Sequence, residues 1–255
     1  MFKKSWLNYC MISAISFVIF LSCSSGIMLT KENRMSLKAI SVNSLVIFAT
    51  DNVWVLNSGG PPLMMGGAVG AIASNVRNES RHKTDEFANT LNTEFKRMLS
   101  RSVKDYAIEN LKKQSNLTIC ADSSCKSDAQ LIILITAYGF ANWGMYSGGK
   151  FQPTLRIRGY LLKNPPANYT IKQSIFNDDG SIKEYGSLTF LDPEKHPIIW
   201  DEDVMAGWLG GSNSNRKSDL LKFSDNLPDM ELAVAEVTNE AVTKLLANVI
   251  GTGSE

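Results

Sequence analysis

The chain has 255 residues, of which 44% are apolar and 20% are charged, with 26 basic and 25 acidic side chains. This composition is typical of a globular protein and argues against a disordered chain, a collagen-like repeat or a disulfide-dense miniprotein. The near-zero net charge argues against a general nucleic-acid binder, because such proteins carry a clear excess of basic residues.

The amino-terminal segment, residues 1–22, has the pattern of a secretory signal peptide. Lys3 and Lys4 give it a positive start, and no further charge follows until Lys31. An apolar run comes next and ends in small residues around Ser22. A basic start, an apolar run and small residues after it are the three parts of such a leader.

The residues that end this segment resemble the lipobox of bacterial lipoproteins. In that motif a small residue, here Ser22, precedes a cysteine, here Cys23, that receives lipid and becomes the first residue. Phe20 and Leu21 depart from the family pattern, which prefers leucine and then a small residue. The resemblance implies acyl chains on Cys23 and, because Ser24 rather than aspartate follows, residence in the outer membrane. An uncleaved signal anchor and a conventional cleavage that leaves Cys23 as a thiol are the alternatives.

The first part of the mature chain is expected to be a lipidated cysteine with a polar tether over residues 23–36. Residues 37–50 and 53–56 are rich in β-branched and other apolar side chains and predict strands. The segment 63–76 repeats small residues every four positions, at Gly66, Gly70 and Ser74. On a helix these form a close-packing face, which would contact a membrane, other copies of the chain or the protein's own sheet.

Two amphipathic helices are predicted, one over residues 84–114, with Thr84 as its N-cap, and one over 228–250. Strands are predicted between them. Residues 131–138 form an unbroken apolar run, as expected of a central strand buried on both faces. Residues 154–162 alternate, which predicts a strand with one solvated face carrying Arg156, Arg158 and Tyr160. The remaining predicted strands are 117–120, 169–176, 185–191 and 198–200.

This order of elements predicts an α+β fold in one globular domain over residues 37–251. A strand–helix–strand crossover normally pairs its strands in parallel, whereas strands joined by hairpins pair antiparallel. We therefore expect a single mixed sheet with the two amphipathic helices on one face.

Cys120 and Cys125 are close enough in sequence to form a disulfide, which an oxidising periplasm would favour. Two free thiols are the alternative. A zinc site would need further ligands, and the chain offers only His82 and His196. We predict no metal and no cofactor.

Two aromatic, glycine-containing stretches are predicted as loops. The first carries Tyr138, Phe140, Trp143 and Tyr146, and the second carries Trp208. Aromatic side chains on such loops are common at protein interfaces, so these residues are candidate partner-binding positions. The alternative is that they cap an open end of the core.

The sequence contains no nucleophile elbow, phosphate loop, dinucleotide fingerprint or zinc-binding helix, and we name no catalytic residue. The acidic cluster 201–203 is expected to be a solvated strand end. An envelope hydrolase would have to assemble its site from scattered carboxylates such as Asp201 and Asp203, and a close cluster of buried ionisable groups beside a cleft would favour it.

The order of lipobox, tether, strand, glycine-rich segment, long helix and buried strand resembles small Gram-negative envelope lipoproteins, both uncharacterised outer-membrane ones and auxiliary ones of transport or secretion assemblies. The resemblance implies a lipid-anchored periplasmic accessory module that binds another envelope protein and catalyses nothing. The alternatives are a carboxylate-based hydrolase and a self-associating ring or pore subunit.

Overall fold

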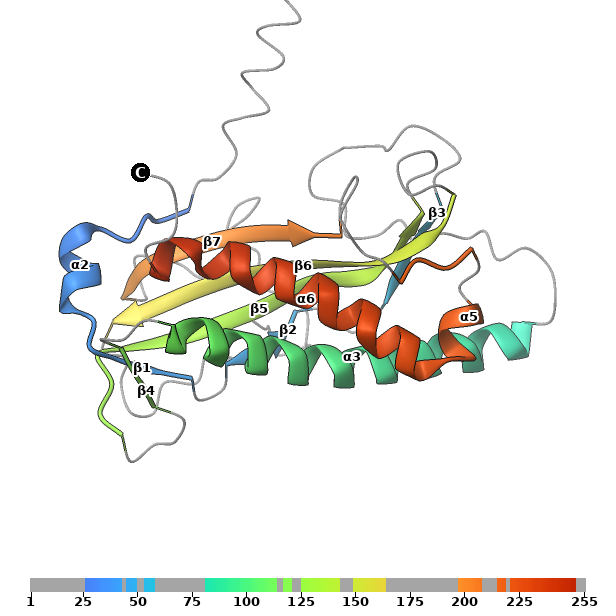
Figure 1. Cartoon of the computed structure of the whole chain (residues 1–255), viewed down its shortest axis with the longest axis horizontal. Helices are drawn as coiled ribbons and strands as arrows, with labels where there is room; N and C mark the ends of the chain where they lie inside the picture. Colours follow the sequence, from blue (N-terminus) through green and yellow to red (C-terminus); the bar gives the residue numbers. More distant parts are fainter. Residues whose placement is uncertain are drawn as a thin grey trace, which may run out of the picture.

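A computed structural model of the chain describes residues 26–42, 45–49, 53–57, 81–113, 117–120, 125–142, 149–163, 197–207, 215–218 and 221–250. Two long helices lie side by side across one face of a sheet (Figure 1). This arrangement confirms the predicted α+β fold with a single mixed sheet and two helices on one face.

The described strands form a seven-stranded sheet with the order β4-β1-β5-β6-β7, and β2 and β3 also pair with β5. Every pair that involves β1, β2 or β3 is parallel, whereas β5–β6 and β6–β7 are antiparallel. The parallel pairing of β1 with β4 across the long helix confirms the predicted crossover. The strands are β1 (Ala39–Ser41), β2 (Val46–Phe48), β3 (Trp54–Asn57), β4 (Thr118–Cys120), β5 (Ala129–Asn142), β6 (Phe151–Lys163) and β7 (Ile198–Ala206).

Several strand boundaries differ from the prediction, and two of the differences change the topology or the site. The single strand expected over residues 37–50 is divided into β1 and β2, which pair with β5 one after the other. The strand expected at 198–200 continues to Ala206, because β7 follows the long strand β6 as far as Leu155. The hairpin strands predicted at 169–176 and 185–191 lie outside the described residues.

The helices are α2 (Lys31–Ser36), α3 (Arg81–Lys112), α5 (Leu221–Ser224) and α6 (Leu227–Ile250). α3 begins before the predicted N-cap, so Thr84 lies inside the helix and not at its start. Neither glycine nor proline interrupts residues 81–83, and the helix extends back through them. α6 matches its prediction to within one residue.

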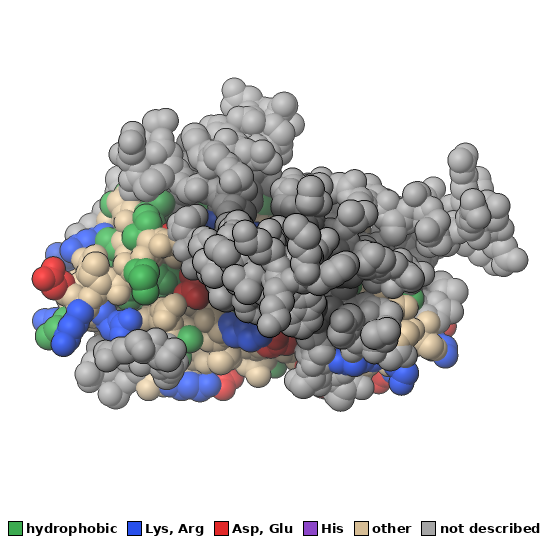
Figure 2. Space-filling model, turned by 90° about the horizontal axis from the view of Figure 1, so that it is seen from above, with side chains coloured by type: hydrophobic (Ala, Val, Ile, Leu, Met, Phe, Trp, Pro, Cys, Tyr) green, Lys and Arg blue, Asp and Glu red, His purple; other side chains and the backbone are tan. Residues whose placement is uncertain are grey.

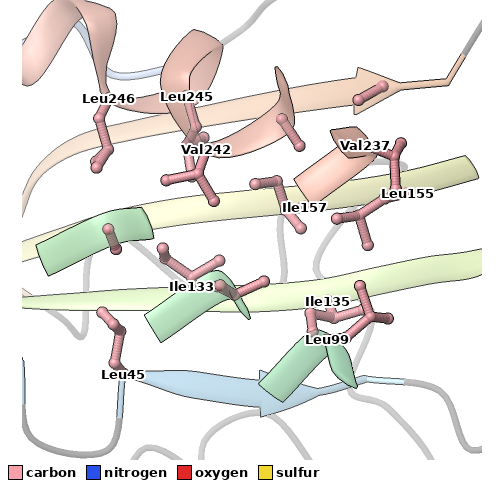
Figure 3. Close-up of a cluster of buried hydrophobic side chains, with 14 of the residues drawn as sticks. Leu45, Leu99, Ile133, Ile135, Leu155, Ile157, Val237, Val242, Leu245 and Leu246 are labelled. Atoms are coloured by element: carbon pink, nitrogen blue, oxygen red, sulfur yellow. The ribbon is translucent and has the colours of Figure 1, made fainter. Parts of the chain in front are cut away.

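The main core fills the space between the sheet and the two long helices. Ile133 and Ile135 on β5 and Ile157 on β6 meet Leu99 from α3 and Leu245 from α6 (Figure 3). All five side chains are fully buried. The apolar periodicity of the two predicted helices therefore corresponds to the faces that cover the sheet.

The opposite face of the sheet carries a second, smaller apolar cluster. Ile132 and Leu134 on β5 join Tyr160 and Leu162 on β6, and all four are fully buried. Burial of β5 on both faces was predicted from its unbroken apolar run. The solvated face expected for the next strand is wrong at two of its three positions, because Tyr160 and Arg158 are buried.

Two links fasten the start of the domain to the sheet. Cys120 and Cys125 form a disulfide between the end of β4 and the chain that enters β5, as predicted. Asp128 accepts hydrogen bonds from the backbone N–H groups of Lys38 at 2.8 Å and Ala39 at 2.9 Å. These two donors hold the pKa of Asp128 below its usual value of 3.8, since they stabilise the charged carboxylate.

Candidate functional site

A pocket of about 450 Å³ lies along β7, the last strand of the sheet among the described residues. We call it the β7-edge pocket. β6 and β7 supply most of its lining, and α2, α6 and the chain before α2 supply the rest. The lining residues are Gly26, Ile27, Met28, Leu29, Arg34, Arg156, Arg158, Trp200, Asp201, Glu202, Asp203, Met205 and Asn248.

One wall of this pocket is the segment Gly26–Leu29, which is fastened to β7. The carbonyl oxygen of Ile27 accepts a hydrogen bond from the Asp201 N–H at 3.0 Å. The Ile27 N–H donates in turn to a carboxylate oxygen of Asp201. Gly26 lies so close to the Asp201 carbonyl that any side chain there would collide with it. Leu29 is 7% exposed and joins the main core.

The predicted tether over residues 23–36 is therefore corrected. From Gly26 onward the chain belongs to the folded domain, first along β7 and then as α2, which Thr30 caps by accepting from the Asn33 N–H. The polar composition of this stretch gave no periodic signal, because it is held by backbone hydrogen bonds and a single carboxylate and not by an apolar face.

A cluster of four charged side chains lies on the sheet face away from the long helices. Two are arginines of β6 and two are aspartates of β7, and they pair diagonally across the strands: Arg156 with Asp203, and Arg158 with Asp201. We call these residues the Arg–Asp cluster. Side chains two apart on a strand share a face, so both arginines face both aspartates.

The two pairs differ in burial. Arg156 binds Asp203 through two hydrogen bonds of 2.9 and 3.0 Å, with the arginine side chain 38% exposed. Arg158 donates through both Nε and Nη2 to one oxygen of Asp201, and these side chains are only 3% and 4% exposed. A buried charge is tolerated only when it is paired, so each member of the inner pair depends on the other.

The acidic cluster was predicted as a solvated strand end, and this is wrong for Asp201. β7 extends well beyond these residues, so Asp201 and Asp203 lie within the strand and face the arginines of β6. The buried ionisable cluster beside a pocket is the arrangement that the hydrolase alternative requires. The carboxylates of both aspartates, however, already form ion pairs with guanidinium groups.

Glu202 faces the opposite side of β7 from its two acidic neighbours. Its Oε2 accepts a hydrogen bond of 2.9 Å from the side-chain amide of Asn248 on α6. Partial burial raises the pKa of Glu202, because desolvation penalises the charged carboxylate, and the charge of Asp201 acts in the same direction. Burial thus favours the protonated form of Glu202.

The candidate partner-binding residues of the first aromatic stretch are partly corrected. Tyr138 and Phe140 lie inside β5, which continues to Asn142, and both side chains are fully buried against Phe95 of α3. They complete the core and offer no surface. The other predicted positions lie outside the described residues: Cys23, Gly66, Gly70, Ser74, Trp143, Tyr146, His196 and Trp208.

Sequence reasoning missed the Arg–Asp cluster, although the signals for it were present. Alternation along 154–162 placed two arginines on one strand face, and the acidic residues at 201 and 203 have the same spacing of two. Extending the strand predicted at 198–200 by a few residues would have brought them together. The docking of Gly26–Leu29 had no comparable signal.

The described residues contain no group of three or more His, Cys, Asp or Glu side chains placed to hold a metal ion. Among the described helices, none has the length and apolar character needed to cross a membrane.

The chain shows a distant likeness to proteins of known structure. No family model matches the chain. No curated protein matches it either. The chain is similar to a crystal structure of a Xanthomonas campestris protein described as family-model DUF330, at 10% identity and a TM-score of 0.36, over 85% of this chain and 86% of that one. This similarity is too loose to assign a shared fold or a shared function.

Removing one partner of the buried Arg158–Asp201 pair should destabilise the protein far more than removing one partner of the more exposed Arg156–Asp203 pair. Asp201→Asn leaves Arg158 charged and buried, so we expect a loss of about 3–5 kcal/mol in the free energy of unfolding. Asp203→Asn, the matched control, should cost less, about 1 kcal/mol, since Arg156 can turn to water and Arg158, whose Nη1 lies 4.0 Å from Asp203, keeps its pair with Asp201. Urea denaturation measures both, and equal losses would contradict the assignment.

Glu202→Gln should change how stability depends on pH. The folded protein holds the Glu202 proton more tightly than the unfolded chain, so the free energy of unfolding of the wild type falls as pH rises from 4.5 through the raised pKa. The glutamine variant lacks this component. Relative to the wild type it should therefore gain stability across that range in denaturant titrations. Parallel pH profiles for the two proteins would show that burial does not perturb Glu202.

Proposed function

We propose that this chain is a lipid-anchored accessory module of the Gram-negative envelope, which binds another envelope protein and catalyses no reaction. Acyl chains on Cys23 would hold it on the membrane, in keeping with the lipobox-like residues that end the leader. The observation that carries the proposal is the fastening of Gly26–Leu29 to β7, since it puts the start of the folded domain directly after the expected lipid attachment site.

The distance between anchor and domain follows from the chain length. Only Ser24 and Ser25 separate Cys23 from Gly26. Three residue steps span at most about 11 Å when fully extended. A lipidated Cys23 would therefore keep the β7 edge next to the lipid headgroups, in contrast to a long tether, which would let the domain reach far from the membrane.

The disulfide between Cys120 and Cys125 supports an oxidising compartment, because cytoplasmic proteins seldom keep such bonds. The Arg–Asp cluster supports binding over catalysis. A carboxylate that serves as a general base needs a lone pair directed at the substrate, whereas Asp201 and Asp203 accept from arginine and, at Asp201, also from the backbone of Ile27.

The outer edge of β7 supports a protein partner. The Asp201 N–H points away from β6 toward Ile27, so the N–H groups of Asp203 and Met205 point the same way. No described residue pairs with the strand there. The outer edge of a sheet can accept an extended segment of a partner through backbone hydrogen bonds, here beside a pocket.

A second candidate function, hydrolysis, is favoured by one observation. Glu202 lines the pocket with a raised pKa, which is the property of a general acid. The described part of the pocket supplies no second carboxylate without a guanidinium partner. We therefore place this candidate behind the accessory module.

The lipid anchor is tested by the mass of the purified native protein. We expect a product that begins at Cys23 and carries the added mass of acyl chains. Cys23→Ser should abolish this mass and leave the leader uncleaved, because the cysteine is the residue on which lipidation acts. Cys10→Ser, in the leader, is the matched control and should change nothing. An intact leader in the wild type, or a Cys23 without acyl groups, would overturn the anchor.

The partner surface is tested by site-specific photo-crosslinking in cells. A photoreactive residue at Met205 should give a discrete larger product that contains a second envelope protein, since this position lies on β7, whose outer edge has no partner strand among the described residues. The same residue at the exposed position Glu231 on α6 is the control and should give none. A product of two copies of this chain would favour the self-associating alternative, and the absence of any product would contradict partner binding at β7.

A further inference from the structure

Four exposed residues at the start of the domain form a small apolar and basic surface. Met28 is 81% exposed and Met35 is 74% exposed, the highest values among the large apolar side chains of the described residues. Lys31 and Arg34 are exposed beside them. We call Met28, Lys31, Arg34 and Met35 the N-terminal patch.

The members of the patch lie close together. Arg34 and Met35 follow Lys31 on α2 by three and four positions, so both lie on the side of the helix that carries Lys31. Met28, which precedes the helix by three residues, lines the same pocket as Arg34 and therefore lies near α2. Figure 2 shows hydrophobic and basic side chains, together with acidic ones, at the end of the molecule that carries α2.

This combination of side chains suits the surface of a bilayer. Flexible apolar side chains are stabilised when they enter the boundary between headgroups and acyl chains. Basic side chains next to them are attracted to anionic headgroups, and each contributes about 1 kcal/mol near such a surface. Leaving the two methionine side chains exposed to water is unfavourable relative to burying them.

We propose that the N-terminal patch contacts the membrane surface to which the chain is anchored. The inference rests on the lipid anchor of the proposed function and extends it, because it assigns the orientation of the domain. Cys23 lies within about 11 Å of Gly26 at full extension, and Gly26 is fastened to β7. The patch follows directly after Gly26, so the anchor would bring these side chains and not the far end of the helices to the bilayer.

The fastening of Gly26–Leu29 is what gives the orientation its direction. A free tether would let the domain rotate, and no surface would be preferred. Here the chain leaves the anchor, runs along β7 and enters α2 without a free segment among the described residues. The β7-edge pocket, which Met28 and Arg34 border, would then open close to the headgroups.

The test uses the full chain, reconstituted in vesicles of phosphatidylethanolamine and phosphatidylglycerol. A fluorescent label is attached at Met28→Cys, Met35→Cys or, as a matched control, Leu232→Cys. Leu232 is also an exposed apolar residue, 57% exposed, but it lies near the start of α6. This end of α6 lies beside α5 and away from α2 (Figure 1). Lipids that carry a quencher on the headgroup should quench the labels at 28 and 35 several-fold more than the label at 232.

A charge variant separates bilayer contact from mere proximity. With the label at Met35→Cys, the double change Lys31→Gln and Arg34→Gln should lower the equilibrium constant for contact by roughly tenfold or more in anionic vesicles, since each basic residue contributes about a factor of five. High salt should have a similar effect on the unaltered chain. In vesicles of phosphatidylcholine alone, the two forms should differ little.

Failure of this inference can be told apart from failure of the anchor. Equal quenching at positions 28, 35 and 232, with acyl chains present on Cys23, would overturn the patch and leave the anchor standing. A bare Cys23 would overturn the anchor, whatever the quenching. Quenching that is insensitive both to the charge change and to lipid charge would overturn the basic contribution. Protection of residues 28 and 35 only in the presence of a second protein would assign the patch to a protein partner instead.

Discussion

Asp201 makes two interactions at once, one with Arg158 and one with Ile27, and the structure along β7 depends on both. Its carboxylate neutralises a buried arginine of the neighbouring strand, and the same carboxylate and its backbone N–H hold both polar groups of Ile27. A buried guanidinium without a counter-charge would be very costly, so the aspartate must stay in place. Because it stays in place, the chain that precedes the first helix is held along the sheet and does not move as a separate tether.

The orientation that we propose for the domain depends on that fastening. A short connection from a lipid to a free tether would confine the protein to the membrane without orienting it. A short connection to a segment fixed on β7 would do both, which is why the exposed methionines and basic residues of α2 and the pocket beside them become informative together. One chain of contacts thus relates the proposed anchor, the N-terminal patch and the outer edge of β7.

The parts of the fold that were predictable are those with a periodic apolar signal. The spacing of Leu91, Phe95 and Met98 indicated the long helix, and the unbroken run 131–138 indicated a strand buried on both faces. Strand ends were less predictable: β5 and β7 both continue past the predicted limits, which moved Tyr138 and Phe140 into the core and Asp201 into the sheet. The docking of Gly26–Leu29 could not be predicted, because its partner lies 174 residues away and is a single carboxylate.

Amide hydrogen exchange measures directly whether Ile27 is held by Asp201, on which the position of residues 26–36 depends. We expect the amides of Ile27 and Asp201 to exchange slowly and to a similar degree, because each donates a hydrogen bond to the other residue. Exchange at Ile27 as fast as in an unstructured peptide, alongside a protected Asp201, would contradict this expectation. Such a result would indicate that residues 26–36 form a free tether, as predicted from the sequence.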